Sequence, residues 1–426
     1  MNRRLTSVMI GLGLVAAVLS PAAAQPSTTS ERASVNSEGE QANSDSFAPA
    51  LSSTGRFVAY ESYASNLVPD DTNQSADVFL HDEQEGTTLR VSEATSGAQG
   101  NRGSFDPAIS ANGKFVAFIT EATNLSVKLD RNHHQDIYVH NRLTGQTNRV
   151  NINNAGKQAD GESADPSITD DGRYVAFAST ATNLSVKGDH NDALDVFVYD
   201  RKTRKTNRVS VNSAGKEGNS QSADPAISAS GRYVAFTSSA RNLVDNDRNG
   251  NADVFVYDRK TQKTTRVSVA SSGQQADDRS YAPAISSTGR YVAFISDATN
   301  LVADDTNATN DVFVHDMETG RTSVVSVSSS GELANGATFY DDGGISISPN
   351  GRMVGFVSYA TNLVENDVNN RVDAFVHDRR TGTTVRVGRE SISIDVANTF
   401  AAFDSAAPDE AMIDTNNAYD VFVRPL

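Results

Sequence analysis

Seven loops of this sequence carry the pattern D-x-N-x-x-x-D, in which acidic and amide side chains stand at positions one, three and seven. Hard cations such as Ca²⁺ take oxygen ligands, and this spacing resembles the first half of an EF-hand loop. Position five varies among the copies, and position twelve lacks the bidentate glutamate of an EF-hand. We therefore predict that at least one loop binds calcium. The candidate metal ligands are Asp71, Asn73, Asp77, Asp130, Asn132, Asp136, Asp189, Asn191, Asp195, Asp247, Asn249, Asp253, Asp305, Asn307, Asp311, Asp367, Asn369, Asp373, Asp414, Asn416 and Asp420.

The same loop residues have a second explanation that needs no ion. Asp and Asn side chains form Asx turns with the backbone, and copies of a repeat share turn residues for that reason alone. An Asn-Leu pair, as in Asn183-Leu184, could also hold the loop, through a buried leucine and an asparagine bonded to backbone. The seventh copy has Asp409 and Glu410 in place of that pair but keeps the triplet. The sequence leaves both explanations open.

The histidines fall into two groups, neither of which we expect to bind metal. Those that follow the DVF-V segment share their slot with tyrosines, which indicates a strand position that accepts a half-buried ring; they are His81, His140, His315 and His377. Those within the acidic loops are expected to be solvated, since that is the usual state of a surface-loop histidine; they are His133, His134 and His190.

Neither a G-x-S-x-G elbow nor an H-E-x-x-H motif occurs in the sequence. A single catalytic centre needs residues that break the equivalence of the copies. The most irregular stretch is the insertion at 341–344, next to Tyr340, so a unique site is expected there if one exists. We predict no catalytic residue and no cofactor other than calcium.

The triplets are positioned by a repeat of about 58 residues. The segment GRFVAY at Gly55 recurs in close variants at Gly113, Gly172, Gly231, Gly289 and Gly351. The DVF segment recurs seven times, so one copy of the first segment has decayed. We place it at Asn398, which precedes Asp420 by the usual interval, because Asn tolerates the positive φ that Gly adopts.

Each copy contains four β-like runs bounded by Gly, Asn, Asp and Ser, for example 226–228, 232–237, 253–257 and 265–269. Four strands per period is one propeller blade, so we predict an all-β fold, a seven-bladed β-propeller. The chain ends at Leu426 after a third strand, so a strand within residues 31–37 should complete the seventh blade. We also expect arginines that start outer strands, such as Arg266, to pair with aspartates that end third strands, such as Asp258.

The run SADPAISASGRYVAF, followed by DVFVYDRKTQKTTRVS, resembles the TolB-type, WD-repeat-like propeller repeat of bacteria. The resemblance covers essentially all of the chain after its leader. It implies a propeller but no single activity, because such propellers include partner-binding modules, appendages of peptidases and bodies of polysaccharide lyases.

Arg3, Arg4, an apolar run at 8–19 and Ala22 to Ala24 predict a signal peptide at 1–24 and a single propeller domain at 25–426. The apolar run is too short to span a membrane. The chain has no cysteine and a net charge of -16, which disfavours nucleic acid and anionic lipid as partners. We expect a monomer that is exported to the periplasm or secreted.

A regular repeat suits a rigid ring that displays loops. The predicted function is therefore a non-catalytic binding module for an extracytoplasmic protein or polymer, with calcium in its blade loops. Two alternatives are a polysaccharide-active enzyme of the lyase type and a calcium-responsive surface or matrix protein.

Overall fold

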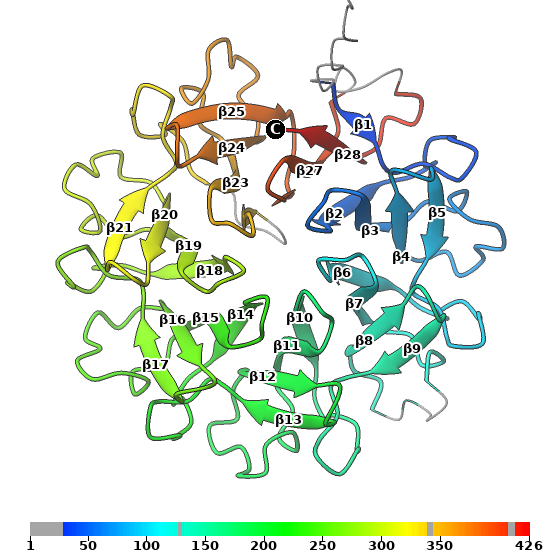
Figure 1. Ribbon diagram of the computed structural model, residues 1–426, viewed down its shortest axis with the longest axis horizontal. Coiled ribbons are helices and arrows are strands. Elements are labelled where there is room, and N and C mark those ends of the chain that lie inside the picture. The colour runs from blue at the N-terminus through cyan, green and yellow to red at the C-terminus, as the bar shows by residue number, and fades with distance from the viewer. Residues whose placement is uncertain (1–28, 127–129, 131, 339–343, 408–413) are drawn as a thin grey trace, which may run out of the picture.

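The computed structural model describes residues 29–126, 130, 132–338, 344–407 and 414–426. The expected signal peptide lies outside the described residues, as do 340–343 of the irregular stretch and the pair Asp409 and Glu410. Within the described residues, the chain forms 28 strands in seven four-stranded antiparallel sheets. Figure 1 shows these sheets as blades around a ring, which confirms the predicted seven-bladed β-propeller. No helix in the described ranges is long and apolar enough to cross a membrane.

Successive blades contain successive strands of the chain. Blades one to three are β2 (Ser46–Leu51), β3 (Phe57–Ser62), β4 (Asp77–Asp82) and β5 (Thr87–Arg90); β6 (Ser104–Ile109), β7 (Phe115–Thr120), β8 (Asp136–Asn141) and β9 (Gln146–Arg149); and β10 (Ser163–Ile168), β11 (Tyr174–Ser179), β12 (Asp195–Asp200) and β13 (Lys205–Arg208). Blades four to six are β14 (Ser222–Ile227), β15 (Tyr233–Ser238), β16 (Asp253–Asp258) and β17 (Lys263–Arg266); β18 (Ser280–Ile285), β19 (Tyr291–Ser296), β20 (Asp311–Asp316) and β21 (Arg321–Val324); and β22 (Ile345–Ile347), β23 (Met353–Ser358), β24 (Asp373–Asp378) and β25 (Thr383–Gly388).

The seventh blade joins the two ends of the chain, as predicted. It contains β26 (Ile394–Val396), β27 (Phe400–Ser405), β28 (Asp420–Pro425) and, as its fourth strand, β1 (Glu31–Arg32). Arg32 lies opposite Phe422, and the amide of Ala33 donates to the carbonyl of Val421 at 2.8 Å. This pairing covers the edge of β28, which would otherwise be open to other strands.

Neighbouring blades pack through apolar side chains of their inner strands. Between blades three and four, Val196 and Val198 share a buried cluster with Val234 and Phe236. The second and third strands of every blade also stack a pair of aromatic rings, such as Phe236 and Phe255, with centroids 5.9 Å apart. The repeat is therefore a packing unit that is completed only by its neighbours.

In blades one to six, a glycine of the inner turn is required by the aromatic ring of the preceding blade. Gly231 has φ +71°, and a Cβ on it would lie 2.4 Å from Cδ2 of Tyr174 in blade three. Gly55 of blade one meets Phe400 of blade seven in the same way, with a Cβ distance of 2.5 Å. Contacts between neighbouring blades therefore explain why the glycine of the GRYVAF segment recurs.

The expected pairing of Arg266 with Asp258 is wrong, because the two residues lie at opposite ends of the β16–β17 hairpin. Arg266 stands opposite Phe255 and forms an ion pair with Asp253 at 3.3 Å, whereas Asp258 stands opposite Lys263. The partner of Asp258 is Arg232, whose Nε and Nη2 donate to its two carboxylate oxygens at 3.0 and 2.7 Å.

The reason given for Asn398 is also wrong, because this residue does not adopt a positive φ. Val396 pairs with Ala401, five residues on, whereas Ile285 in blade five pairs with Val292, seven residues on. The turn of blade seven is shorter, so it does not need the left-handed residue of the other copies.

Candidate functional site

All seven triplets lie in the loops between the second and third strands of their blades. The last aspartate of each triplet is the first residue of a third strand and is buried, as Asp253 is at the start of β16. The other six are Asp77, Asp136, Asp195, Asp311, Asp373 and Asp420.

The middle asparagines hold the loops in shape. In every copy the amide oxygen accepts a hydrogen bond from the backbone N–H two residues later, as in Asn249 with Asn251 at 3.1 Å. The same Asx turn is formed by Asn73, Asn132, Asn191, Asn307, Asn369 and Asn416. In blade four, Asn249 Nδ2 also donates to the carbonyl of Ala276 at 3.1 Å. The turn explanation is therefore confirmed for the middle position.

In blades one, four and seven, the two aspartates of the triplet are bridged by a glutamine that follows the outer strand. In blade four, Gln275 Nε2 donates to Asp247 Oδ1 and Asp253 Oδ2, both at 2.9 Å. Arg266 adds ion pairs to the same two carboxylates. Equivalent glutamines bridge the first and last aspartates in blades one and seven; they are Gln99 and Gln41. In these blades an amide nitrogen lies between the carboxylates, where a cation would otherwise have to lie.

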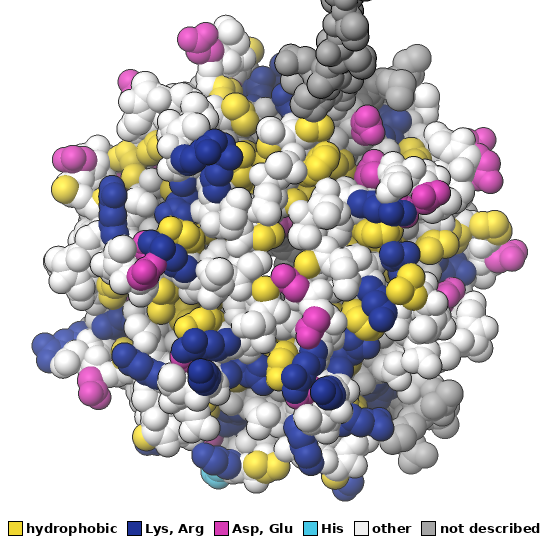
Figure 2. Space-filling view, viewed as in Figure 1, with side chains coloured by type: hydrophobic (Ala, Val, Ile, Leu, Met, Phe, Trp, Pro, Cys, Tyr) yellow, Lys and Arg dark blue, Asp and Glu magenta, His cyan; other side chains and the backbone are white. Residues whose placement is uncertain are grey.

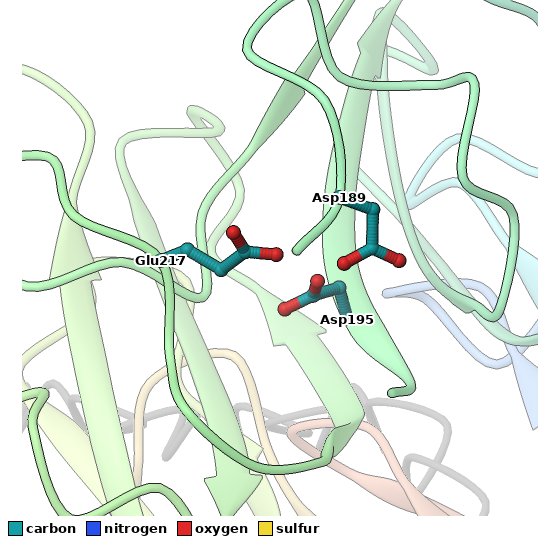
Figure 3. A group of neighbouring side chains, drawn as sticks. All are labelled: Asp189, Asp195 and Glu217. Atoms are coloured by element: carbon teal, nitrogen blue, oxygen red, sulfur yellow. The ribbon is translucent and has the colours of Figure 1, made fainter. Parts of the chain in front are cut away.

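Blade three differs, because a glutamate takes the place of that glutamine. Figure 3 shows the carboxylates of Asp189, Asp195 and Glu217 pointing toward one another. One ligand oxygen from each lies within 4.8 Å of the others. The Asp189, Asp195 and Glu217 side chains are only 2%, 1% and 16% exposed. We call these three residues the blade-three carboxylate cluster.

One cation, Arg208, accompanies this cluster. Its guanidinium contacts Glu217, and its Nε and Nη2 lie 3.2 Å from Asp195 Oδ2 and 3.7 Å from Asp189 Oδ1. Ser210 donates to Asp195 Oδ1 at 2.6 Å, but Asp195 Oδ2 accepts no hydrogen bond. Burial raises the pKa of Asp195 to about 6, although Ser210 and Arg208 oppose the shift. Burial, and after it the hydrogen bond with Glu217, also raise the pKa of Asp189.

Glu217 and Arg208 line an open groove of about 940 Å³, which we call the blade 3–4 groove, whereas Asp189 and Asp195 do not line it. Its sides are the loop at 185–191 and the connection at 206–219 of blade three, and Tyr257, Arg259 and Gln262 of blade four. Lys187 and Lys216 are exposed in it. Figure 2 shows Lys and Arg side chains gathered over the lower sector of the ring, where β12 to β17 lie in Figure 1.

The central channel, unlike the groove, is lined by acidic side chains. A cavity of about 390 Å³ is lined by the first strands of the blades, including Asp106, Asp165 and Asp224 in blades two to four. All three have positive φ, at bulges where the pairing register shifts. Figure 2 shows acidic side chains beside the central hollow.

The strand histidines occupy the expected slot but are fully buried rather than half-buried, and two of the three loop histidines lie beside a glutamate. Those after the DVF-V segments are buried, and His140 Nδ1 lies 2.9 Å from Thr147 Oγ1, an arrangement repeated by His81, His315 and His377. Burial lowers the pKa of His140 to about 4. Of the loop histidines, His133 is exposed, whereas His134 and His190 each place Nδ1 3.2 Å from a glutamate, Glu162 and Glu217 respectively.

Glu217 was missed at the sequence level. Its signal is visible in the aligned copies, where KEG at 216–218 stands against QQA at 274–276. The D-x-N-x-x-x-D pattern lies within the loops between the second and third strands, whereas Glu217 reaches the cluster from a different connection.

No family model matches the chain, and no curated protein matches it. Among solved structures, it is similar to TolB from Acinetobacter baumannii, with 15% identity over 82% of this chain and 64% of that one and a TM-score of 0.44. An oligogalacturonate lyase in complex with manganese has 12% identity, 90% coverage of both chains and a TM-score of 0.53. The propeller domain of the Trilobed protease from Pyrococcus furiosus has 11% identity, covers 89% and 95%, and has a TM-score of 0.54. The last two support the propeller fold alone.

Proposed function

We propose that the chain is an exported, non-catalytic binding module that holds an anionic protein or polymer in the blade 3–4 groove. The observation that carries this proposal is that Lys187, Lys216 and Arg259 line one groove of a chain whose net charge is -16. Such a local field raises the concentration of oppositely charged partners and speeds their association.

The groove offers polar contacts in addition to charge. Its lining includes the amide side chains of Asn207, Asn219 and Gln262, which are exposed. Amides both donate and accept hydrogen bonds, so they complement the backbone of a polymer as well as its charged groups. Arg259 is held in place by a hydrogen bond to the carbonyl of Gly231 at 2.5 Å and by stacking on Tyr174.

Non-catalytic binding agrees with the regularity of the ring. The side chains that recur in every blade are used to hold its loops and to pack neighbouring blades. A rigid repeat that displays variable loops is a common basis for binding surfaces.

The test uses two defined anionic probes, poly-glutamate and alginate, in direct binding titrations at low salt. We expect at least one to bind wild type and to bind a Lys187→Glu/Lys216→Glu variant at least tenfold more weakly. The matched control is Lys202→Glu/Lys205→Glu, which places the same charges on exposed sites of blade three outside the groove lining. Equal binding by all three proteins, or no binding by wild type, would overturn the proposal.

The same samples test the lyase alternative. Incubation with alginate and polygalacturonate, followed at about 235 nm, detects the unsaturated products of a lyase. We expect no change in absorbance. Product formation that depends on the protein would replace the binding proposal with a catalytic one.

A further inference from the structure

We propose that the blade-three carboxylate cluster binds one hard divalent cation, through Asp189, Asp195 and Glu217. This inference goes beyond the proposed function and does not depend on it. It also restricts the predicted cation binding to one of the seven loops and adds a ligand, Glu217, that belongs to none of the D-x-N-x-x-x-D triplets.

The charges of the cluster call for a compensating group. Three nearly buried carboxylates face one guanidinium, that of Arg208, so two negative charges are left over when all three are ionised. Buried charges are costly unless they are paired or coordinate a metal. A divalent cation supplies the two missing charges.

The distances suit such an ion. Hard cations of the size of Ca²⁺ bind oxygen at about 2.3–2.6 Å, so two ligands on opposite sides of the ion stand about 5 Å apart. The three ligand oxygens lie within 4.8 Å of one another. Asp195, which is 1% exposed, provides an oxygen, Oδ2, that accepts no hydrogen bond; its ion pair with Arg208 Nε at 3.2 Å lacks hydrogen-bond geometry.

Blade four indicates which structural role a cation would take in blade three. In blade four the amide of Gln275 joins the connection after β17 to the aspartates of the loop before β16. Glu217 stands in the same connection of blade three but, when ionised, has no hydrogen to donate. A cation bound by all three carboxylates makes the same link between loop and connection that the glutamine makes elsewhere.

The neighbouring histidine adds a further ligand position. His190 Nδ1 lies 3.2 Å from Glu217 Oε2, and its backbone N–H donates to Glu217 Oε1 at 3.2 Å. The imidazole is 74% exposed, so it can turn toward an ion or away from it. Carboxylates alone suit Ca²⁺, Mg²⁺ and Mn²⁺, whereas an added imidazole favours Mn²⁺.

The test is calorimetric titration of the metal-stripped protein with Ca²⁺ and, separately, Mn²⁺. We expect one site in wild type and none in Glu217→Gln, which reproduces the glutamine bridge of blades one, four and seven and should therefore fold normally. At a cation concentration of about 100 times Kd, wild type should melt about 3 °C higher and the variant should not shift.

A second variant builds the site elsewhere. Gln275→Glu places a third carboxylate beside Asp247 and Asp253, with Arg266 in the role of Arg208, and we expect two sites in place of one. No binding by wild type at millimolar Ca²⁺ or Mn²⁺, undiminished binding by Glu217→Gln, or a single site in a normally folded Gln275→Glu would overturn the inference. Binding of the anionic probes to the Glu217→Gln variant tests the proposed function of the groove independently of the cation site.

Discussion

Glu217 and Gln275 occupy the same position in consecutive blades, yet only Gln275 can donate hydrogen bonds to the two aspartates that it faces. A single oxygen in place of an NH₂ group thus changes a closed hydrogen-bonded bridge into a set of three carboxylates. In a ring of equivalent units, one such difference defines a site that no other described blade contains.

The contact between Gly231 and Tyr174 predicts a strong effect on stability. Gly231→Ala should lower the free energy of unfolding by about 2 kcal/mol or more, because the added Cβ both strains the backbone at positive φ and meets the ring. Gly273→Ala is the matched control, since Gly273 also has positive φ but nothing lies within 4 Å of its would-be Cβ. Chemical denaturation measures both. Equal losses in the two variants would show that the ring contact contributes nothing.

The N-terminal strand is expected to stabilise the whole ring. A chain that begins at residue 37 loses β1 and the ion pair between Arg32 and Asp420 at 3.1 Å. It should melt more than about 5 °C below a control chain that begins at residue 29, because the edge of β28 is then unpaired. Thermal melts followed by circular dichroism compare the two, and coincident curves would contradict the closure role of β1.

The middle asparagines should be important for the stability of their loops. Asn249→Ala removes both the Asx turn and the hydrogen bond to Ala276, and should cost about 1–2 kcal/mol. Asn251→Ala, at the variable position five, is the control and should cost less than about 0.5 kcal/mol. The ranking is measured by denaturant titration. A larger loss for Asn251→Ala would mean that the loop is held in another way.

A buried carboxyl near the N-terminal strand predicts a pH dependence. Burial, and then the charges of Glu31 and Asp82, raise the pKa of Glu83 to about 7, and its Oε1 accepts no hydrogen bond. Because the folded-state pKa lies above the unfolded value, the contribution of Glu83 is favourable below about pH 4.5 and is lost as the pH rises through 7. Glu83→Gln should therefore stabilise the protein at pH 8, by about 1–3 kcal/mol, and change little at pH 4. An equal gain in stability at pH 8 and at pH 4 would contradict the ionisation of Glu83 as its cause.

The sequence predicted the number of blades and the closing strand because both follow from a repeat that can be counted. Asp420 marks a third strand and Arg32 a fourth strand, and both can be recognised from their place in the repeat alone. The Arg266 pairing failed for a geometric reason, since the pattern shows which residues recur but not which end of a hairpin each one occupies.

The candidate site was predicted only in part. Asp189 and Asp195 stood out through their spacing within one loop, whereas Glu217 reaches them from another connection that only the fold brings near. Asn191 was grouped with the two aspartates by spacing, but its amide oxygen is used by the backbone of Ala193. Local spacing therefore could not separate the residues that hold the loop from those that face a ligand.

The most direct test of the account is a crystal structure of the protein grown with Mn²⁺, with anomalous diffraction recorded at the manganese edge. We predict one anomalous peak, about 2.2 Å from oxygens of Asp189, Asp195 and Glu217. A peak in the central channel beside Asp165, peaks in several blade loops, or no peak at all would contradict the assignment of the cation site to blade three.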